Sequence, residues 1–354
     1  MPPLSAIDCI SPAWYHTRLL LLGQKNARLF FKLAAVAFFA EMGGLNGSFR
    51  SPARHAHGAS PLLSGVFLLF LIIGVVIALA VALALFYLSS RLQFVLFHLV
   101  LRSETWIAPL WRRYGPATWR WIGLKLLFFL AAVLCLVPIM VPAVLLLIRA
   151  IDSHQQEGSS SHIASFVLAV FCFILALLIL ILVIATAYVL LHDFGLPSMA
   201  LEATPMRETV RRIFALIRLE PGQVALYVLM RYVLALAGAL ISYLVLVVVT
   251  LFAGIPLGAV AFGLWKGLHL ASAGEHVLMI AGWVVLALLL LAVVVIAAIL
   301  LFGYLFTFLE AYAIFFLSGR YPLLAQQLTP PLPPLPQSWS FAPWTPTLYT
   351  PPPA

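Results

Sequence analysis

Five long apolar runs dominate the chain and are separated by short polar stretches. They cover residues 61–88, 121–148, 163–191, 223–252 and 277–301, and the last continues with little interruption to 317. A helix needs about 20 consecutive apolar residues to cross a hydrocarbon core of about 30 Å. Each run is long enough, so the pattern predicts an all-α fold, a polytopic transmembrane helical bundle.

A sixth and shorter apolar run spans Leu29–Met42, and its status depends on charge. If residues 29–45 cross the bilayer, 15 of the 19 basic residues other than Arg231 lie on one side and four on the other. If they do not cross, the division is 11 against 8. Basic residues accumulate on the cytoplasmic side of membrane proteins. We therefore predict about six spans, with both termini in the cytoplasm and the chain in a bacterial inner membrane.

Composition excludes a soluble protein. Of 354 residues, 64% are hydrophobic and only 9% are charged, with a mean hydropathy of +1.12, whereas about a quarter of the residues in soluble domains are charged. The net charge of +9 comes from basic residues at the ends of apolar runs, where they meet anionic headgroups. This placement predicts membrane lipids, and not nucleic acid, as partners.

The predicted cytoplasmic connections contain amphipathic segments that suit the membrane surface. Residues 91–121 combine tryptophan with arginine, and residues 204–219 place Met206, Val210, Ile213 and Ile217 on one helical stripe with arginines opposite. The predicted membrane-surface contacts are Trp106, Trp111, Trp119, Trp121, Arg112, Arg113, Arg207, Arg211 and Arg212.

The two ends of the chain differ from the helical domain at residues 29–317. Residues 1–28 are expected to form an N-terminal interfacial segment. Residues 318–354 are rich in proline, including PPLPPLP at 330–336, which disfavours helix and sheet. We expect a disordered cytoplasmic tail that acts as a solvated tether or docks on a protein partner.

Ionisable residues inside a span are candidates for function, because a charge in the membrane requires a partner or water. Asp193, Arg231 and Glu310 occur at similar predicted depths towards the inner side. They predict a polar pocket that opens to the cytoplasm. The alternative is a structural ion pair that holds helices together.

Other chemistry has little support in the sequence. His55 and His57 have the spacing of metal ligands but stand in a polar loop that collects histidines, so we expect no metal. Nucleotide-binding, serine-hydrolase and zinc-protease motifs are absent, and no cofactor is predicted. Asp193 and Glu310 could act as acid and base in an intramembrane enzyme, but the chain offers no nucleophile.

Two stretches carry a family resemblance. They are RLFFKLAAVAFFAEMGGLNGS at 28–48 and DFGLPSMALEATPMRETVRRIFALIRLEPG at 193–222. Together they resemble uncharacterised bacterial six-span membrane proteins, similar to the membrane domain associated with glycerophosphodiester phosphodiesterases. The resemblance implies a six-helix fold in the inner membrane, without the phosphodiesterase reaction, which belongs to a separate soluble domain.

These observations favour a non-enzymatic membrane protein that binds or passes a lipid or small solute through the polar pocket. The alternative is a scaffold that recruits protein partners through its amphipathic helices and its proline-rich tail.

Overall fold

A computed structural model describes residues 4–22, 27–42, 61–102, 107–154, 160–268 and 273–328 of the chain. Every element in these ranges is an α-helix. The ten helices are α1 (Ile10–Leu22), α2 (Ala27–Met42), α3 (Pro61–Arg102), α4 (Ile107–Arg113), α5 (Gly115–His154), α6 (Ser160–Glu202), α7 (Met206–Leu219), α8 (Pro221–Leu268), α9 (Ala273–Ser318) and α10 (Pro322–Leu328).

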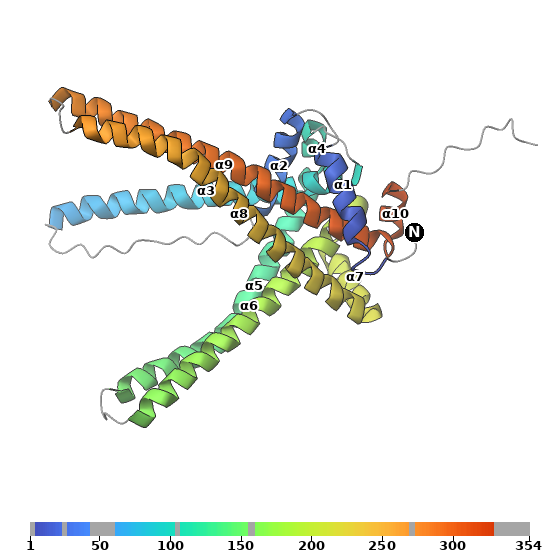
Figure 1. Cartoon of the computed structure of the whole chain (residues 1–354). Coiled ribbons are helices and arrows are strands. Elements are labelled where there is room, and N and C mark those ends of the chain that lie inside the picture. Colours follow the sequence, from blue (N-terminus) through green and yellow to red (C-terminus); the bar gives the residue numbers. More distant parts are fainter. Residues whose placement is uncertain are drawn as a thin grey trace, which may run out of the picture.

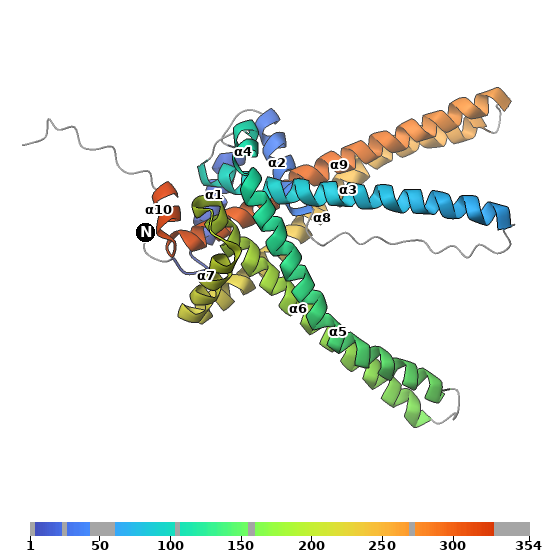
Figure 2. The same cartoon turned by 180° about the vertical axis from the view of Figure 1, so that it is seen from behind.

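The five long helices meet at one compact end. Beyond it they continue as three separate parts, of which two are helix pairs (Figure 1). Helix α3 and the two hairpins α5–α6 and α8–α9 project from this end like arms, while α1, α2, α4, α7 and α10 pack around it (Figures 1 and 2). We use "arms" for residues 61–85, 126–154, 160–183, 240–268 and 273–296, and "compact end" for the remaining described parts (Figure 1).

The arms are apolar and exposed along their length. Five helices are long and apolar enough to cross a membrane, and their most apolar windows are at most 12% buried. Large side chains such as Phe70, Leu134 and Phe252 are about 70% exposed. Exposed surface of this kind is stable only in an apolar solvent. The five predicted spans are therefore confirmed as helices of a membrane protein.

The compact end has a true core, because the helices continue past the point where the sequence pattern predicted surface connections. Residues 92–101 of α3 were expected to lie at the headgroup level, yet they form one of the most buried segments described. Aromatic rings pack against one another in the same core, with Phe94 against Tyr114 at 5.5 Å and Tyr227 stacked on Phe316 at 4.4 Å between centroids.

The predicted sixth span lies in α2, which packs within the compact end. Its buried face consists of small residues, Ala34, Ala37 and Ala40, and Ala34 touches Gly303 of α9 through the backbone. Small residues permit this close approach. The far end of α2 brings Glu41 next to Glu310 of α9. The count of six spans stays a prediction.

The folded region extends beyond the predicted tail boundary at Ser318. Helix α10 follows directly, and its Leu324 is fully buried. Arg320 pairs with Glu220 at 2.8 Å and donates to the Leu4 carbonyl at 3.1 Å. The prediction of disorder from residue 318 was therefore wrong for this stretch, because the prolines that prevent helix are concentrated from residue 330 onward. Residues 329–354 lie outside the described part.

Candidate functional site

The buried charged residues gather where the long helices enter the compact end. Asp193 and His192 lie near the end of α6, Arg231 lies in the third turn of α8, and Glu310 precedes the end of α9. Glu41 joins them from α2. The helices converge here, so one or two polar residues on each of four helices are enough to form a cluster.

Asp193 and Arg231 form a direct ion pair. The Arg231 Nε lies 2.9 Å from Asp193 Oδ2, and the two side chains are 12% and 0% exposed. Tyr227 donates to the same carboxylate at 2.6 Å, and Arg231 also donates to the Leu309 carbonyl at 3.0 Å. Charged hydrogen bonds of this kind satisfy the carboxylate without water.

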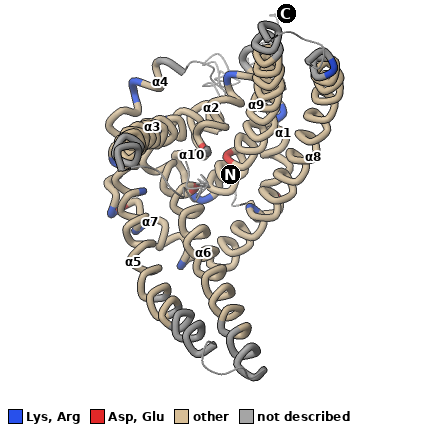
Figure 3. Tube along the Cα trace, turned by 90° about the vertical axis from the view of Figure 1, so that its left-hand side faces the viewer, with Lys and Arg blue, Asp and Glu red and all other residues tan. Residues whose placement is uncertain are grey.

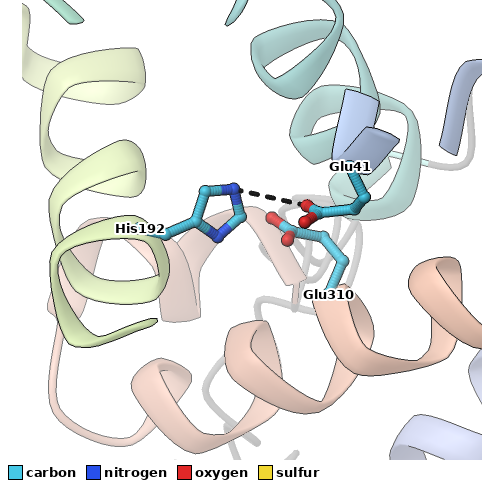
Figure 4. A group of neighbouring side chains, drawn as sticks. All are labelled: Glu41, His192 and Glu310. Atoms are coloured by element: carbon cyan, nitrogen blue, oxygen red, sulfur yellow. Dashed lines mark ion pairs between the residues drawn. The ribbon is translucent and has the colours of Figure 1, made fainter. Parts of the chain in front are cut away.

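Glu310 joins a second group with Glu41 and His192 (Figure 4). One nitrogen of His192 and one carboxylate oxygen from each glutamate all lie within 4.8 Å of one another. His192 Nε2 is 3.5 Å from Glu41, and its Nδ1 is 3.0 Å from Asp193 Oδ1. His192 therefore connects this group to the ion pair of Asp193 and Arg231.

A second hydrogen-bond network, on α3 and α5, flanks this cluster. The Lys125 ammonium donates to Gln93 at 2.7 Å and to Ser90 at 3.2 Å, and the Trp121 indole donates to Gln93 at 2.9 Å. Gln93 in turn donates to the Ala40 carbonyl of α2 at 3.2 Å. This network fixes α2, the helix that carries Glu41, against α3 and α5.

Apolar cavities lie a short distance from this cluster, on both sides of α7. One cavity of about 300 Å³ lies between α5, α6 and α7 and is lined by eleven apolar residues. They are Leu124, Leu127, Phe128, Ala131, Ala187, Leu190, Leu191, Val210, Ile213, Phe214 and Ile217. Asp193, Arg231 and Glu310 are absent from its wall, so this space is distinct from the predicted polar pocket.

The second cavity, of about 330 Å³, lies on the other side of α7, towards α9 and α10. Its wall is apolar except at one rim, which carries Ser198, Arg212, Arg320 and Tyr321. The Tyr321 hydroxyl donates to Glu202, which also pairs with Arg212 at 2.7 Å. Burial and the Glu202 carboxylate raise the pKa of Tyr321, and the bond to Glu202 raises the pKa of Arg212.

Helix α7 matches the amphipathic segment predicted at residues 204–219. Ile213 is buried, and Val210 and Ile217 line the first cavity. Arg207, Arg211 and Arg218 are exposed and do not line the cavity, and Figure 3 shows basic residues along this helix.

The other predicted membrane-surface residues divide into four groups. Arg112, Arg113 and Trp119 are exposed, and Trp111 is half-buried against the Arg91 guanidinium. Trp121 is fully buried, so its assignment to the surface was wrong; its indole N–H requires the internal partner Gln93. Trp106 lies outside the described residues, as do the metal candidates His55 and His57.

Sequence reasoning missed Glu41, Tyr227 and Lys125. Glu41 could have been found from the sequence, because it is the only acidic residue in the short apolar run Leu29–Met42. An acidic side chain within an apolar helix requires a partner. Tyr227 and Lys125 carried none, since aromatic and basic residues are common near the ends of spans.

Comparisons with known proteins identify a family but no individual relative. No curated protein and no solved structure matches the chain, and no link to the glycerophosphodiester phosphodiesterase membrane domain is found. A family model described as "Family of unknown function (DUF7544)" matches residues 4–326. The chain therefore belongs to this family, whose members have no assigned function.

Proposed function

We propose that this protein is a non-enzymatic membrane protein that binds an anionic lipid beside α7. The single observation that carries the proposal is the apolar cavity of about 300 Å³ between α5, α6 and α7. Cavities of this size and character bind small apolar ligands. The ligand most abundant around a membrane helix is an acyl chain.

The basic face of α7 supports an anionic headgroup. Arg207, Arg211 and Arg218 are exposed on the helix whose other face lines the cavity, and Phe214, 58% exposed, stands between two of them in the helical stripe. Helices with this pattern lie at the interface, and each basic residue near an anionic surface contributes about 1 kcal/mol. A lipid with its chain in the cavity would thus place its phosphate near arginine.

The polar cluster is the weaker candidate for the ligand site. Arg231 is already paired with Asp193 and with a backbone carbonyl, and its side chain is 12% exposed. A solute would have to displace these contacts. The proposed binding site therefore lies beside α7, and the ion pair is assigned a structural role.

We also propose that the compact end faces the cytoplasm of a bacterium. One observation supports this orientation: most of the basic residues that the structure describes lie in the compact end. Both ends of the described chain meet there, as Arg320 donates to the Leu4 carbonyl, so the two ends share one side. The alternative scaffold role would rest on the amphipathic helices and on residues 329–354, which lie outside the described part.

Native mass spectrometry of the full chain, extracted in mild detergent and exposed to phosphatidylglycerol, tests the lipid proposal. Ala131→Phe fills the cavity from an exposed position, and Leu244→Phe, on the lipid-facing surface of α8, is the matched control. We expect one retained lipid in the wild type and the control, and at least a tenfold loss of it in Ala131→Phe. Equal retention in all three proteins, or retention in none, would overturn the proposal.

A charge variant tests the headgroup separately. Replacing Arg207, Arg211 and Arg218 by glutamine should weaken phosphatidylglycerol while leaving neutral phosphatidylcholine unchanged. An equal effect on both lipids would contradict the assignment of α7 as the headgroup contact.

A further inference from the structure

We propose that Glu41, His192 and Glu310 form a binding site for a divalent transition-metal ion of the Zn²⁺ or Mn²⁺ type. The site is independent of the lipid proposal, because none of the three residues lines a cavity beside α7. It joins α2, α6 and α9, which lie far apart in the sequence.

The geometry of the three side chains suits a single ion. Each offers one ligand atom, and these atoms lie within 4.8 Å of one another (Figure 4). Ligands about 2.1 Å from a common ion are at most about 4.2 Å apart. Small side-chain adjustments therefore bring all three atoms into the coordination sphere.

A second observation that points to a metal ligand is the unpaired ring nitrogen of His192. Its Nε2 is buried and has no hydrogen-bond partner, although it points towards Glu41 at 3.5 Å. An unsatisfied buried nitrogen is costly. Coordination of an ion by the Nε2 lone pair would satisfy it and would use the orientation in which the side chain already stands.

The opposite edge of the imidazole is held as in known metal sites. Nδ1 lies 3.0 Å from Asp193 Oδ1, and the other Asp193 oxygen accepts from Tyr227 at 2.6 Å and pairs with Arg231 at 2.9 Å. Metal-bound histidines commonly donate their second ring N–H to a carboxylate, which fixes the tautomer. The ion pair of Asp193 and Arg231 thus becomes a support for a metal ligand.

Charge also favours a cation at this position. Arg231 compensates Asp193, whereas the carboxylates of Glu41 and Glu310 lie next to each other and face the same imidazole (Figure 4). Two carboxylates this close repel unless a cation or a proton is shared. Two oxygen ligands and one imidazole nitrogen suit Zn²⁺, Mn²⁺ or Fe²⁺ better than the thiolate-preferring ions, and three protein ligands leave a coordination position open.

Elemental analysis of the full chain tests the site. The protein is purified with a histidine-free tag, stripped with chelator, and titrated with Zn²⁺, Mn²⁺ and, as an optical probe of coordination, Co²⁺. We expect one ion per chain. Glu310→Gln and His192→Asn should each weaken binding at least 100-fold, and the matched control Glu208→Gln, on the surface of α7, should bind like the wild type.

Folding and binding are separated by a second measurement on the same proteins. Thermal unfolding of the stripped proteins shows whether Glu310→Gln is folded, and the wild type should be stabilised by the ion while Glu310→Gln is not. Absence of a bound ion in the folded wild type would overturn the proposal. So would an adventitious ion only, recognised by equal binding in His192→Asn and the wild type.

Discussion

The arms and the compact end share five long helices but differ in what their side chains contact. In the arms, Gly74, Gly254 and Gly258 have open space where a side chain would begin, whereas Gly238 and Gly303 of the inner parts are in close contact with a neighbouring helix. The arms present a uniform apolar surface to lipid, so their sequence needs only to be hydrophobic. The compact end buries charges and rings against one another, so each position there has a specific neighbour.

The largest expected effect concerns the buried ion pair. Arg231→Met leaves the Asp193 carboxylate buried without its cation, and such a loss costs about 3–5 kcal/mol. The double variant Asp193→Asn/Arg231→Met should recover much of this loss. Denaturant unfolding in micelles measures it, with Leu244→Met in an arm as the neutral control. A single variant as stable as the control would contradict the buried assignment.

Thiol chemistry should also separate the two regions. Cys9 is fully buried in the compact end, and burial raises its pKa to about 11 from an ordinary value of 9.0. Because only the thiolate reacts, maleimide should label Cys9 about 100-fold more slowly than it labels the unfolded chain at neutral pH. The rate should rise about tenfold per pH unit until about 11.

The Cys9 measurement uses the variant Cys135→Ser/Cys172→Ser, which removes the two exposed thiols of the arms. Labelling of folded and denatured protein is followed by mass spectrometry from neutral to alkaline pH. Equal rates in the two states would show that Cys9 is accessible.

A smaller effect is expected at the contact between α2 and α9. A Cβ added at Gly303 meets the backbone of Ala34, so Gly303→Ala should force the helices apart and lose about 1–3 kcal/mol. Gly254→Ala, with nothing within 4 Å, should be neutral or gain up to about 1 kcal/mol from helix propensity. Thermal unfolding of the pair compares the two regions directly. An equal change in stability in both variants would show that the close contact between Gly303 and Ala34 does not limit the packing of α2 on α9.

The smallest expected effect lies on the outer surface of α7. Glu208 approaches Arg212 at 3.3 Å and Arg211 at 3.9 Å, and the Arg211 side chain is 83% exposed. Solvent screens such pairs, so Glu208→Gln should change stability by about 0.5 kcal/mol or less. A loss of several kcal/mol in the same unfolding assay would show that α7 is more enclosed than its exposure indicates.

The sequence predicted those features that depend on one segment at a time. Twenty or more apolar residues identify a span, and the spacing of Val210, Ile213 and Ile217 identifies the inner face of α7, whatever the rest of the chain does. The ionisable character of Asp193, Arg231 and Glu310 was equally visible, because a charge stands out within an apolar run.

Features that depend on several segments could not be predicted from the pattern. Nothing in the run Leu29–Met42 says that Glu41 meets His192 and Glu310, since that contact follows from the packing of alanines against Gly303. Trp121 has the composition of an interfacial residue, but its partner Gln93 lies on another helix. Segment-by-segment hydropathy cannot distinguish a tryptophan at the lipid surface from one in a core.

The contacts that join the two ends of the chain impose an order on its biogenesis. The Tyr312 hydroxyl donates to the Ala6 carbonyl across 306 positions of sequence. Ribosomes add about 5–20 residues per second, so α1 waits roughly 15–60 s for the partner helix α9 to be made. During that interval Cys9, Ala13 and Leu21, all buried in the finished protein, have no α9 to cover them. The compact end is therefore completed last, and loss of α9 would leave the first helix of the nascent chain without its main packing partner.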